Sequence, residues 1–258
     1  MEYTNGYVAF IDILGFSNLV SNEQSADKVK DLFEFIKKFQ YLFNSSPELN
    51  ANVAFFSDSI ILSTNNQVKD NLGMLFVAIW IAESYLYKHT HLFFRGGITK
   101  GLYYHKDSTA FGPAVVNSYR LENQAVYSRI LIEDEIVSTM DEIPFTITMD
   151  VDGKYCFNPY GIGLFRNTPD GTTPTKQQFI KSIREERELL LEAINANLYS
   201  KVSEKYLWRI VPFNKICEIL PDIYNEYHFD FGESDIDEWK SLKVSIKEVE
   251  DNYKARNK

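Results

Sequence analysis

One carboxylate, Asp12, interrupts an otherwise apolar run near the amino terminus, and this feature limits the possible folds more than any other. The run Tyr7–Leu14, with the sequence YVAFIDIL, lies between two glycines and predicts a buried central strand. An unpaired carboxylate inside such a strand is costly, so the fold must supply a partner for Asp12. The turn that follows, Gly15-Phe16-Ser17, offers backbone N–H groups that can face an anion. A carboxylate beside a turn that can bind a phosphate group indicates a site for a metal ion and a nucleotide.

Composition narrows the class of protein. A chain of 258 residues can bury a core without cross-links, and its two cysteines, Cys156 and Cys217, lack the spacing of metal ligands. We therefore expect a reducing, cytoplasmic setting. Neither a signal peptide nor an apolar window of about 18 residues is visible, so no membrane span is expected. The net charge of −9 disfavours nucleic acid as a partner but allows a small phosphorylated ligand bound through metal.

The hydrophobic periodicity predicts an α+β fold in which helices cover a mixed, mostly antiparallel sheet. Strands are expected at 7–14, twice within 52–63, and at 92–101, 109–112, 129–132, 145–149 and 155–159. Helices are expected around 29–43, at 71–87 and from Ala114 onward. The inward face of the first helix is predicted to consist of Val29, Leu32, Phe33, Ile36, Phe39 and Phe43.

A cluster of turn residues, NTPDGTTP at Asn167–Pro174, divides the chain. We therefore predict a first domain over residues 1–166 and a helical C-terminal extension over residues 167–258. Within the extension, a helix is expected over Thr175–Asn197 and another over Val202–Leu220, kinked or interrupted at Pro212. The charged stretch 233–258 is a surface helix or a loose end.

Asp12 has a natural partner in Asp58, at the tip of the hairpin predicted within 52–63. Two carboxylates that converge from different strands can hold two divalent cations, an arrangement suited to displacement at phosphorus. Magnesium prefers such oxygen ligands and shares them with substrate phosphates. The residues alone also allow a simpler interpretation, in which Asp12 is a satisfied buried polar group and Asp58 only a turn residue.

Four segments resemble the motifs of class III nucleotidyl cyclases, the catalytic domains of adenylate and guanylate cyclases. They are FIDILGFSNL, FFSDS, RGGITKG and GPAVVNSYRLE, and they occur in the family's order within 7–165. The resemblance implies the family's ferredoxin-like, palm-type fold and a homodimer with shared active sites. It also implies roles for individual residues: Asp12, Asp58 and the Ile13 carbonyl holding two Mg²⁺ or Mn²⁺, the amides of Gly15, Phe16 and Ser17 receiving phosphate, and Arg120 stabilising charge at the α-phosphate.

Two positions depart from the family pattern. Ser57 stands where the family has a glycine before the second aspartate, a mild change if the turn needs no positive φ. The family's transition-state asparagine would fall on Val116, and Asn117 is one residue late, which makes Asn117 a weak candidate for that role.

The positions that read the base in purine cyclases carry Ala54 and Thr109 here. Strand alternation puts Phe56 on the face of Ala54, where a large ring would narrow the base pocket and favour a smaller base; alternatively, Phe56 faces the core. Arg95 could approach the base or the dimer seam, or it could bridge strands. Tyr119 could stack on the base, although an aromatic residue on a helix is more often core.

This combination resembles the bacterial pyrimidine cyclases of Pycsar antiphage defence. The resemblance implies conversion of UTP to cyclic UMP and diphosphate, and a separate effector that responds to the product. Cyclic CMP is the alternative product. An adenylate cyclase and a catalytically inactive nucleotide sensor are the remaining hypotheses.

Overall fold

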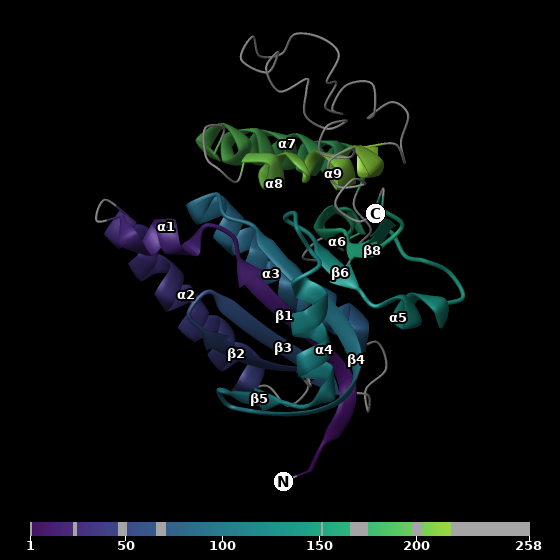
Figure 1. The fold of residues 1–258 in the computed structure, drawn as a ribbon. Coiled ribbons are helices and arrows are strands. Elements are labelled where there is room, and N and C mark those ends of the chain that lie inside the picture. The colour runs from purple at the N-terminus through teal and green to yellow at the C-terminus, as the bar shows by residue number, and fades with distance from the viewer. Residues whose placement is uncertain are drawn as a thin grey trace.

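The computed structural model describes residues 2–22, 25–45, 51–65, 71–150, 152–165, 175–197 and 203–217, which form a mixed α+β fold (Figure 1). The strands are β1 (Thr4–Ile13), β2 (Ala51–Phe56), β3 (Ser59–Asn65), β4 (Phe94–Lys106), β5 (Thr109–Phe111), β6 (Ile130–Ile132), β7 (Ile147–Met149) and β8 (Tyr155–Phe157). The helices are α1 (Phe16–Ser21), α2 (Ala26–Ser45), α3 (Asn71–Thr90), α4 (Pro113–Glu122), α5 (Asp134–Ser138), α6 (Pro159–Phe165), α7 (Lys176–Asn197), α8 (Ser203–Leu207) and α9 (Ile210–Cys217).

The strands form one sheet in the order β2-β3-β1-β4-β6-β8-β7, with β5 paired to β4 outside this path. Every pairing is antiparallel except the parallel pair of β4 and β6. The mixed, mostly antiparallel sheet expected from the sequence is therefore confirmed. Strand β1 lies at its centre, between β3 and β4, as its apolar composition predicted.

Helices cover both faces of the sheet. On one face, the buried side chains of Ala9, Ile11 and Ile13 alternate along β1 and join a core with residues of α2 and α3. On the other face, α4 lies against β4, where Thr99 Oγ1 donates a hydrogen bond of 2.9 Å to the Ala114 carbonyl. Gly97 permits this contact, because a Cβ there would lie 2.6 Å from the Ser118 carbonyl oxygen.

Three details differ from the sequence-based expectations. Phe33 was expected in the core and is 54% exposed, because the buried stripe of α2 is narrower than its apolar pattern. Strand β4 runs on to Lys106 and turns back into β5, so that the predicted strands at 92–101 and 109–112 form one hairpin. The break in the last helix precedes Pro212, which lies in the first turn of α9, where proline is tolerated. Its predicted end at Leu220, the segment 166–174 and the stretch 233–258 lie outside the described residues.

The helices of the extension lie beyond one end of the sheet (Figure 1). They share a hydrophobic cluster with Tyr87, Phe93 and Tyr160 of the preceding part of the chain. Buried ionic contacts join the same two parts: Arg209 of the extension pairs with Glu83 of α3. The division at residue 166 remains a prediction, but the described helices of the extension pack closely on the first part.

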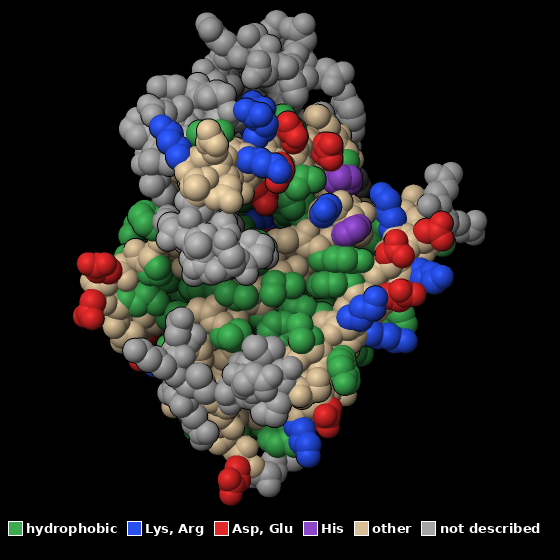
Figure 2. Space-filling view, turned by 180° about the vertical axis from the view of Figure 1, so that it is seen from behind, with side chains coloured by type: hydrophobic (Ala, Val, Ile, Leu, Met, Phe, Trp, Pro, Cys, Tyr) green, Lys and Arg blue, Asp and Glu red, His purple; other side chains and the backbone are tan. Residues whose placement is uncertain are grey.

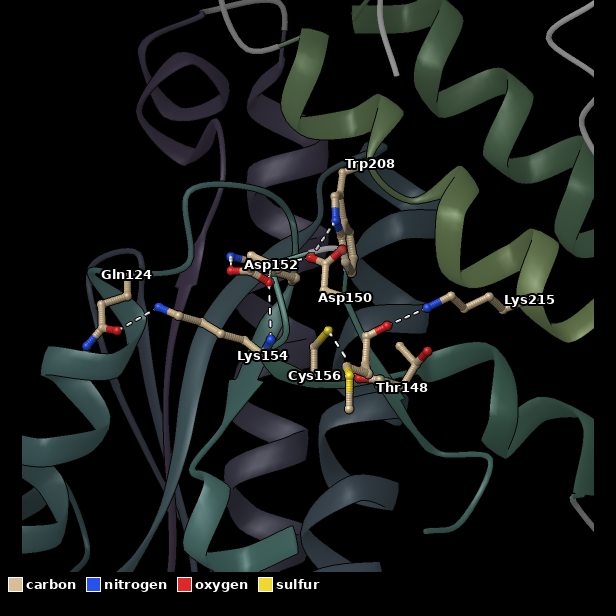
Figure 3. A network of polar contacts seen from close by, with 10 residues as sticks. Gln124, Thr148, Asp150, Asp152, Lys154, Cys156, Trp208 and Lys215 are labelled. Atoms are coloured by element: carbon tan, nitrogen blue, oxygen red, sulfur yellow. Dashed lines mark hydrogen bonds and ion pairs between the residues drawn. The ribbon is translucent and has the colours of Figure 1, made fainter. Parts of the chain in front are cut away.

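A polar network makes a further connection between the two parts (Figure 3). Trp208 Nε1 donates a 3.0 Å hydrogen bond to Asp150 Oδ2, and the same carboxylate pairs with the buried Arg129. Arg129 also pairs with Asp152 at 3.0 Å. Buried charges of this kind are stable only when they are paired. The network therefore requires Trp208 of the extension to stay in contact with Asp150 of the first part.

The face that α2 and α3 cover is shown in Figure 2, where hydrophobic side chains gather across the middle. Trp80 and Ile81 of α3 line a groove there together with Phe35 and Ile162. Among the described helices, none is long and apolar enough to cross a membrane.

Candidate active site

The fold brings Asp12 and Asp58 to the same end of adjoining strands. Asp12 pairs with Ser59 across β1 and β3, and the next residue, Ile13, donates its N–H to the Asp58 carbonyl at 2.9 Å. The two side chains interact electrostatically, and Asp12 remains partly exposed. The convergence of the two acids that the sequence suggested is present in the structure.

The oxygen atoms at this strand end suit a hard divalent cation. Because the N–H and C=O of one strand residue point toward the same neighbouring strand, the Ile13 carbonyl faces the turn that carries Asp58. Two carboxylates and one carbonyl would leave other coordination positions of a bound Mg²⁺ for water and phosphate oxygens, which this ion usually keeps as ligands. Within the described part of the chain, no group of three or more His, Cys, Asp or Glu side chains is placed to hold a metal, so an all-protein cage is not part of this site.

Arg95 lies between Asp12 and a second acid, Glu122. Its Nη2 atom is 3.0 Å from Asp12 Oδ2 and 2.7 Å from Glu122 Oε1. Burial raises the pKa of Asp12 above its ordinary value, Arg95 opposes this shift, and the nearby Asp58 adds to it. Burial likewise raises the pKa of Glu122, again against the effect of Arg95. Of the two roles that the sequence left open for Arg95, the structure shows the bridge between strands.

Sequence reasoning assigned no role to Glu122. Glu122 is the last residue of the motif GPAVVNSYRLE and ends α4. It follows Ala114 by eight residues, and this helical spacing was the signal in the sequence that both residues lie on one side of the helix. Ala114, Ser118 and Glu122 recur at four-residue spacing and form the buried side of the helix.

The turn after β1 has the backbone that its glycine suggests. Gly15 has φ 83°, and its carbonyl accepts hydrogen bonds from the N–H groups of Asn18 and Leu19. Phe16 packs partly against the core, whereas Ser17 is exposed. A Cβ at Gly15 would lie 3.2 Å from Leu92 Cδ2 and 3.4 Å from Tyr206 Oη, so only glycine fits without displacement.

Ser57 adopts φ 58°, which means that the turn before Asp58 does use the left-handed conformation. The replacement of glycine by serine is therefore not neutral, because a residue with a Cβ is less stable there than glycine. The exposed position of Ser57 makes the cost purely conformational.

Of the candidates on α4, Arg120 points away from the sheet, whereas Tyr119 contacts it. Asn117, Tyr119 and Arg120 are exposed, and Arg120 forms no ion pair with any described residue. Since Glu122 faces the sheet, Arg120, two residues earlier, lies on the opposite side of the helix. Tyr119 makes an edge contact with Phe10, with ring centroids 5.3 Å apart.

The candidate base-pocket residues fall in two places. Ala54 is buried in β2, in the row of Ile61 and Phe10, while Phe56, at the end of β2, is 84% exposed, which excludes the alternative that its ring faces the core. Thr109 pairs with Lys106 at the far end of β4, whose other end holds Arg95. Strand β4 bends back over the sheet before it reaches Lys106, because His105 Nδ1 lies 2.8 Å from Ser63 Oγ of β3, which is in the same row of the sheet as Val8 and Thr99.

Two residues of the extension reach this end of the sheet and were missed from the sequence. Lys205 interacts electrostatically with Asp12, Glu122 and Arg95, and Tyr206 lies against Gly15. No local sequence pattern predicts this position of Lys205 and Tyr206, because it depends on how α8 packs on the first part of the chain.

No family model and no curated protein matches the chain. Among solved structures, the chain is similar to the adenylyl cyclase CyaB from P. aeruginosa, with 20% identity over 60% of this chain and 94% of that chain and a TM-score of 0.41. It is also similar to the guanylyl cyclase domain of the RhoGC fusion protein from the aquatic fungus Blastocladiella emersonii, with 16% identity over 61% and 94% of the two chains and a TM-score of 0.43. A bacterial light-regulated adenylyl cyclase shows 15% identity over 72% and 99%, with a TM-score of 0.41. Likeness at this level says nothing about activity, which has to come from the site residues themselves.

Proposed function

We propose that the chain is a nucleotide cyclase, which converts a nucleoside triphosphate to its 3′,5′-cyclic monophosphate and diphosphate. The observation that carries the proposal is the convergence of Asp12, Asp58 and the Ile13 carbonyl at one strand end. Oxygen donors from two strands beside a glycine turn suit a metal-bound triphosphate.

In this proposal, two Mg²⁺ or Mn²⁺ ions held by these oxygens would lower the pKa of the ribose 3′-hydroxyl and neutralise the triphosphate. The amides of Gly15, Phe16 and Ser17 donate hydrogen bonds to phosphate oxygens. Arg120 stabilises the charge that develops at the α-phosphate, a role that suits a planar guanidinium. Asn117 is a weaker candidate for a contact in the transition state.

The proposal includes a homodimer with shared sites. The support is the direction of Arg120, which is exposed on the side of α4 opposite Glu122 and so faces away from Asp12 of its own chain. A second copy could supply Arg120 to the site that contains Asp12, and a two-fold arrangement would then form two equivalent sites.

UTP is the proposed substrate and cyclic UMP the product, made in the cytoplasm as the signal of a Pycsar defence system and detected by a separate effector. The support is the combination of a small residue at Ala54 with an exposed aromatic ring at Phe56, on the same face of β2. A ring beside the base would favour a pyrimidine over a purine. CTP is the alternative substrate; Arg95 and Tyr119 are weaker candidates for contacts with the base.

The test is to incubate the purified protein with each of the four nucleoside triphosphates and Mg²⁺ or Mn²⁺ and to identify products by mass spectrometry. Cyclic UMP is expected, and cyclic AMP as the main product would refute the pyrimidine assignment. Asp12→Asn and Asp58→Asn should each reduce turnover at least about a thousandfold, since both metals depend on these oxygens. Asp107→Asn, in the exposed turn between β4 and β5, is the matched control. A folded protein with no turnover of any triphosphate would favour a nucleotide sensor.

A further inference from the structure

The C-terminal extension contributes charge to the strand end that holds Asp12. Lys205, in α8, interacts electrostatically with Asp12 and Glu122 and also with Arg95. Figure 1 shows α8 beyond the end of β1 at which Asp12 lies, which agrees with this interaction. The ammonium group is thus a second cation beside the one that already pairs with both acids.

The backbone of Lys205 is fixed in this place. Its carbonyl accepts a hydrogen bond of 2.5 Å from Ser128 Oγ and a longer one of 3.4 Å from the Ser128 N–H. The Ser128 side chain is fully buried, and its neighbour Arg129 is anchored by the network that also holds Trp208. These contacts position α8 at the Lys205 carbonyl and at Trp208 and do not involve the Lys205 ammonium group.

The environment of Lys205 favours an additional negative charge. Burial and the proximity of Arg95 lower its pKa, even though Asp12 and Glu122 act in the opposite direction. Once a divalent cation is bound at Asp12, that carboxylate is no longer available to neutralise Lys205. An anionic ligand beside the metal would then be its natural partner.

Tyr206, the next residue, supplies a second polar group at the same place. Its side chain is 1% exposed, and its hydroxyl has no hydrogen-bond partner among the described residues. The hydroxyl lies near the Gly15 turn, 3.4 Å from the point that a Cβ would occupy. A buried hydroxyl without a partner is costly, which indicates that it meets a ligand or water.

We infer that Lys205 and Tyr206 of the extension bind the phosphates of the substrate, so that the extension is a working part of the active site. This inference rests on the proposed function, since the ligand is the triphosphate of that substrate. The Lys205 ammonium would pair with phosphate oxygens on the side of the metal away from the base, and the Tyr206 hydroxyl would donate to the same group. The cyclic product lacks these phosphates, so both residues distinguish substrate from product.

The test measures binding of inorganic tripolyphosphate and of 3′-deoxy-UTP by calorimetry, with saturating Mg²⁺ and the full chain. Lys205→Met should weaken both affinities about tenfold and Tyr206→Phe about threefold, as expected for one charged and one neutral hydrogen bond. Lys205→Arg should restore most of the loss, because it keeps the charge. Lys181→Met, which removes an exposed lysine of α7, should bind as the wild type does.

The outcomes separate the inference from the proposed function. If the wild type binds both ligands and Lys205→Met binds them equally well, the inference is wrong and the cyclase proposal stands. A lower melting temperature with unchanged affinity would show that Lys205 is only a structural counter-ion of Asp12. If the wild type binds neither ligand, the proposed function fails together with the inference.

Discussion

Arg95 and Asp12 face each other across the β1–β4 strand pair, with Arg95 Nη2 at 3.0 Å from Asp12 Oδ2. The same guanidinium group reaches Glu122 at 2.7 Å, while its Nε–H has no acceptor among the described residues. The cost of the carboxylate in the central strand is therefore offset by a guanidinium from the adjacent strand. A metal ion at Asp12 would compete with Arg95 for the same oxygens.

Replacement of Arg95 by methionine should strengthen metal binding. With the guanidinium removed, Asp12 and Glu122 attract a cation more strongly, and a partly exposed ion pair is worth about 1 kcal/mol, or roughly fivefold in affinity. Binding of Mn²⁺ without nucleotide can be followed by the loss of the free-ion signal in electron paramagnetic resonance. Lys100→Met, on the same strand, is the control. Unchanged or weaker binding in Arg95→Met would show that Arg95 does not compete with the metal.

A mixing experiment tests the shared site. Asp12→Asn and Arg120→Ala should each be inactive alone, and Arg120→Ala should keep its stability because the side chain is exposed and unpaired within the described residues. In a mixture, half of the dimers combine the two variants and hold one intact site, so about a quarter of the wild-type activity should return. Activity is measured after the subunits have exchanged. If the mixture stays inactive while exchange is demonstrated, Arg120 acts within its own chain or not at all.

The residues that the sequence identified belong to local patterns. Asp12 was recognised because a charge interrupts an apolar strand, and Asp58 because it follows the first strand of a hairpin. Recognition of both residues needs only the alternation of side chains along a strand and the residue preferences of turns. The central position of β1 follows from the same composition. Four short motifs in order were sufficient to connect these residues.

The residues that it missed depend on packing between distant segments. Glu122 meets Arg95 only because α4 packs on β4, and Lys205 reaches the site only because Ser128 fixes α8, 77 positions later in the chain. Phe33 fits a helical apolar period and is nevertheless exposed, because the width of the buried stripe is set by the neighbours of α2. Such information is not contained in a local pattern.

Gly97→Ala should disturb the position of α4. The new Cβ would lie 2.6 Å from the Ser118 carbonyl oxygen and 2.7 Å from Leu121 Cβ, so the helix would have to move away from β4. Crowding of this kind costs about 2 to 3 kcal/mol, and turnover should fall because Arg120 moves with the helix. Urea unfolding measures the stability.

Gly153→Ala is the matched control, since a Cβ there meets nothing within 4 Å. Its φ of 79° still makes the substitution strained, at about 1 kcal/mol. Gly97 has no positive φ, so a loss of stability in Gly97→Ala that is no larger than in Gly153→Ala would mean that crowding against α4 costs little.

The stability of the protein should depend on pH through two partly buried groups that act in opposite directions. Burial lowers the pKa of His105 to about 4, and its Nδ1 lies 2.8 Å from Ser63 Oγ. The unfolded chain therefore binds a proton that the folded chain excludes between about pH 6.5 and 4, and stability falls as the pH is lowered through this range. Burial, with repulsion from Glu83 and Glu185, raises the pKa of Glu186 to about 7. That group stays protonated in the folded chain, so stability falls as the pH rises from about 4.5 to 7.

Variants separate the two effects. Each shift corresponds to at most about 3 kcal/mol, and urea unfolding at pH 5 and pH 7.5 measures the difference between each variant and the wild type. The stability of His105→Asn relative to the wild type should be higher at pH 5 than at pH 7.5, because asparagine has no group that titrates. Glu186→Gln should show the reverse. Its stability relative to the wild type should be higher at pH 7.5, because the wild type then holds a charged, partly buried carboxylate, and the groups that act on it are the acids Glu83 and Glu185. If both differences are the same at the two pH values, neither group titrates between the folded and unfolded states in this range, because only a change in bound protons makes stability depend on pH.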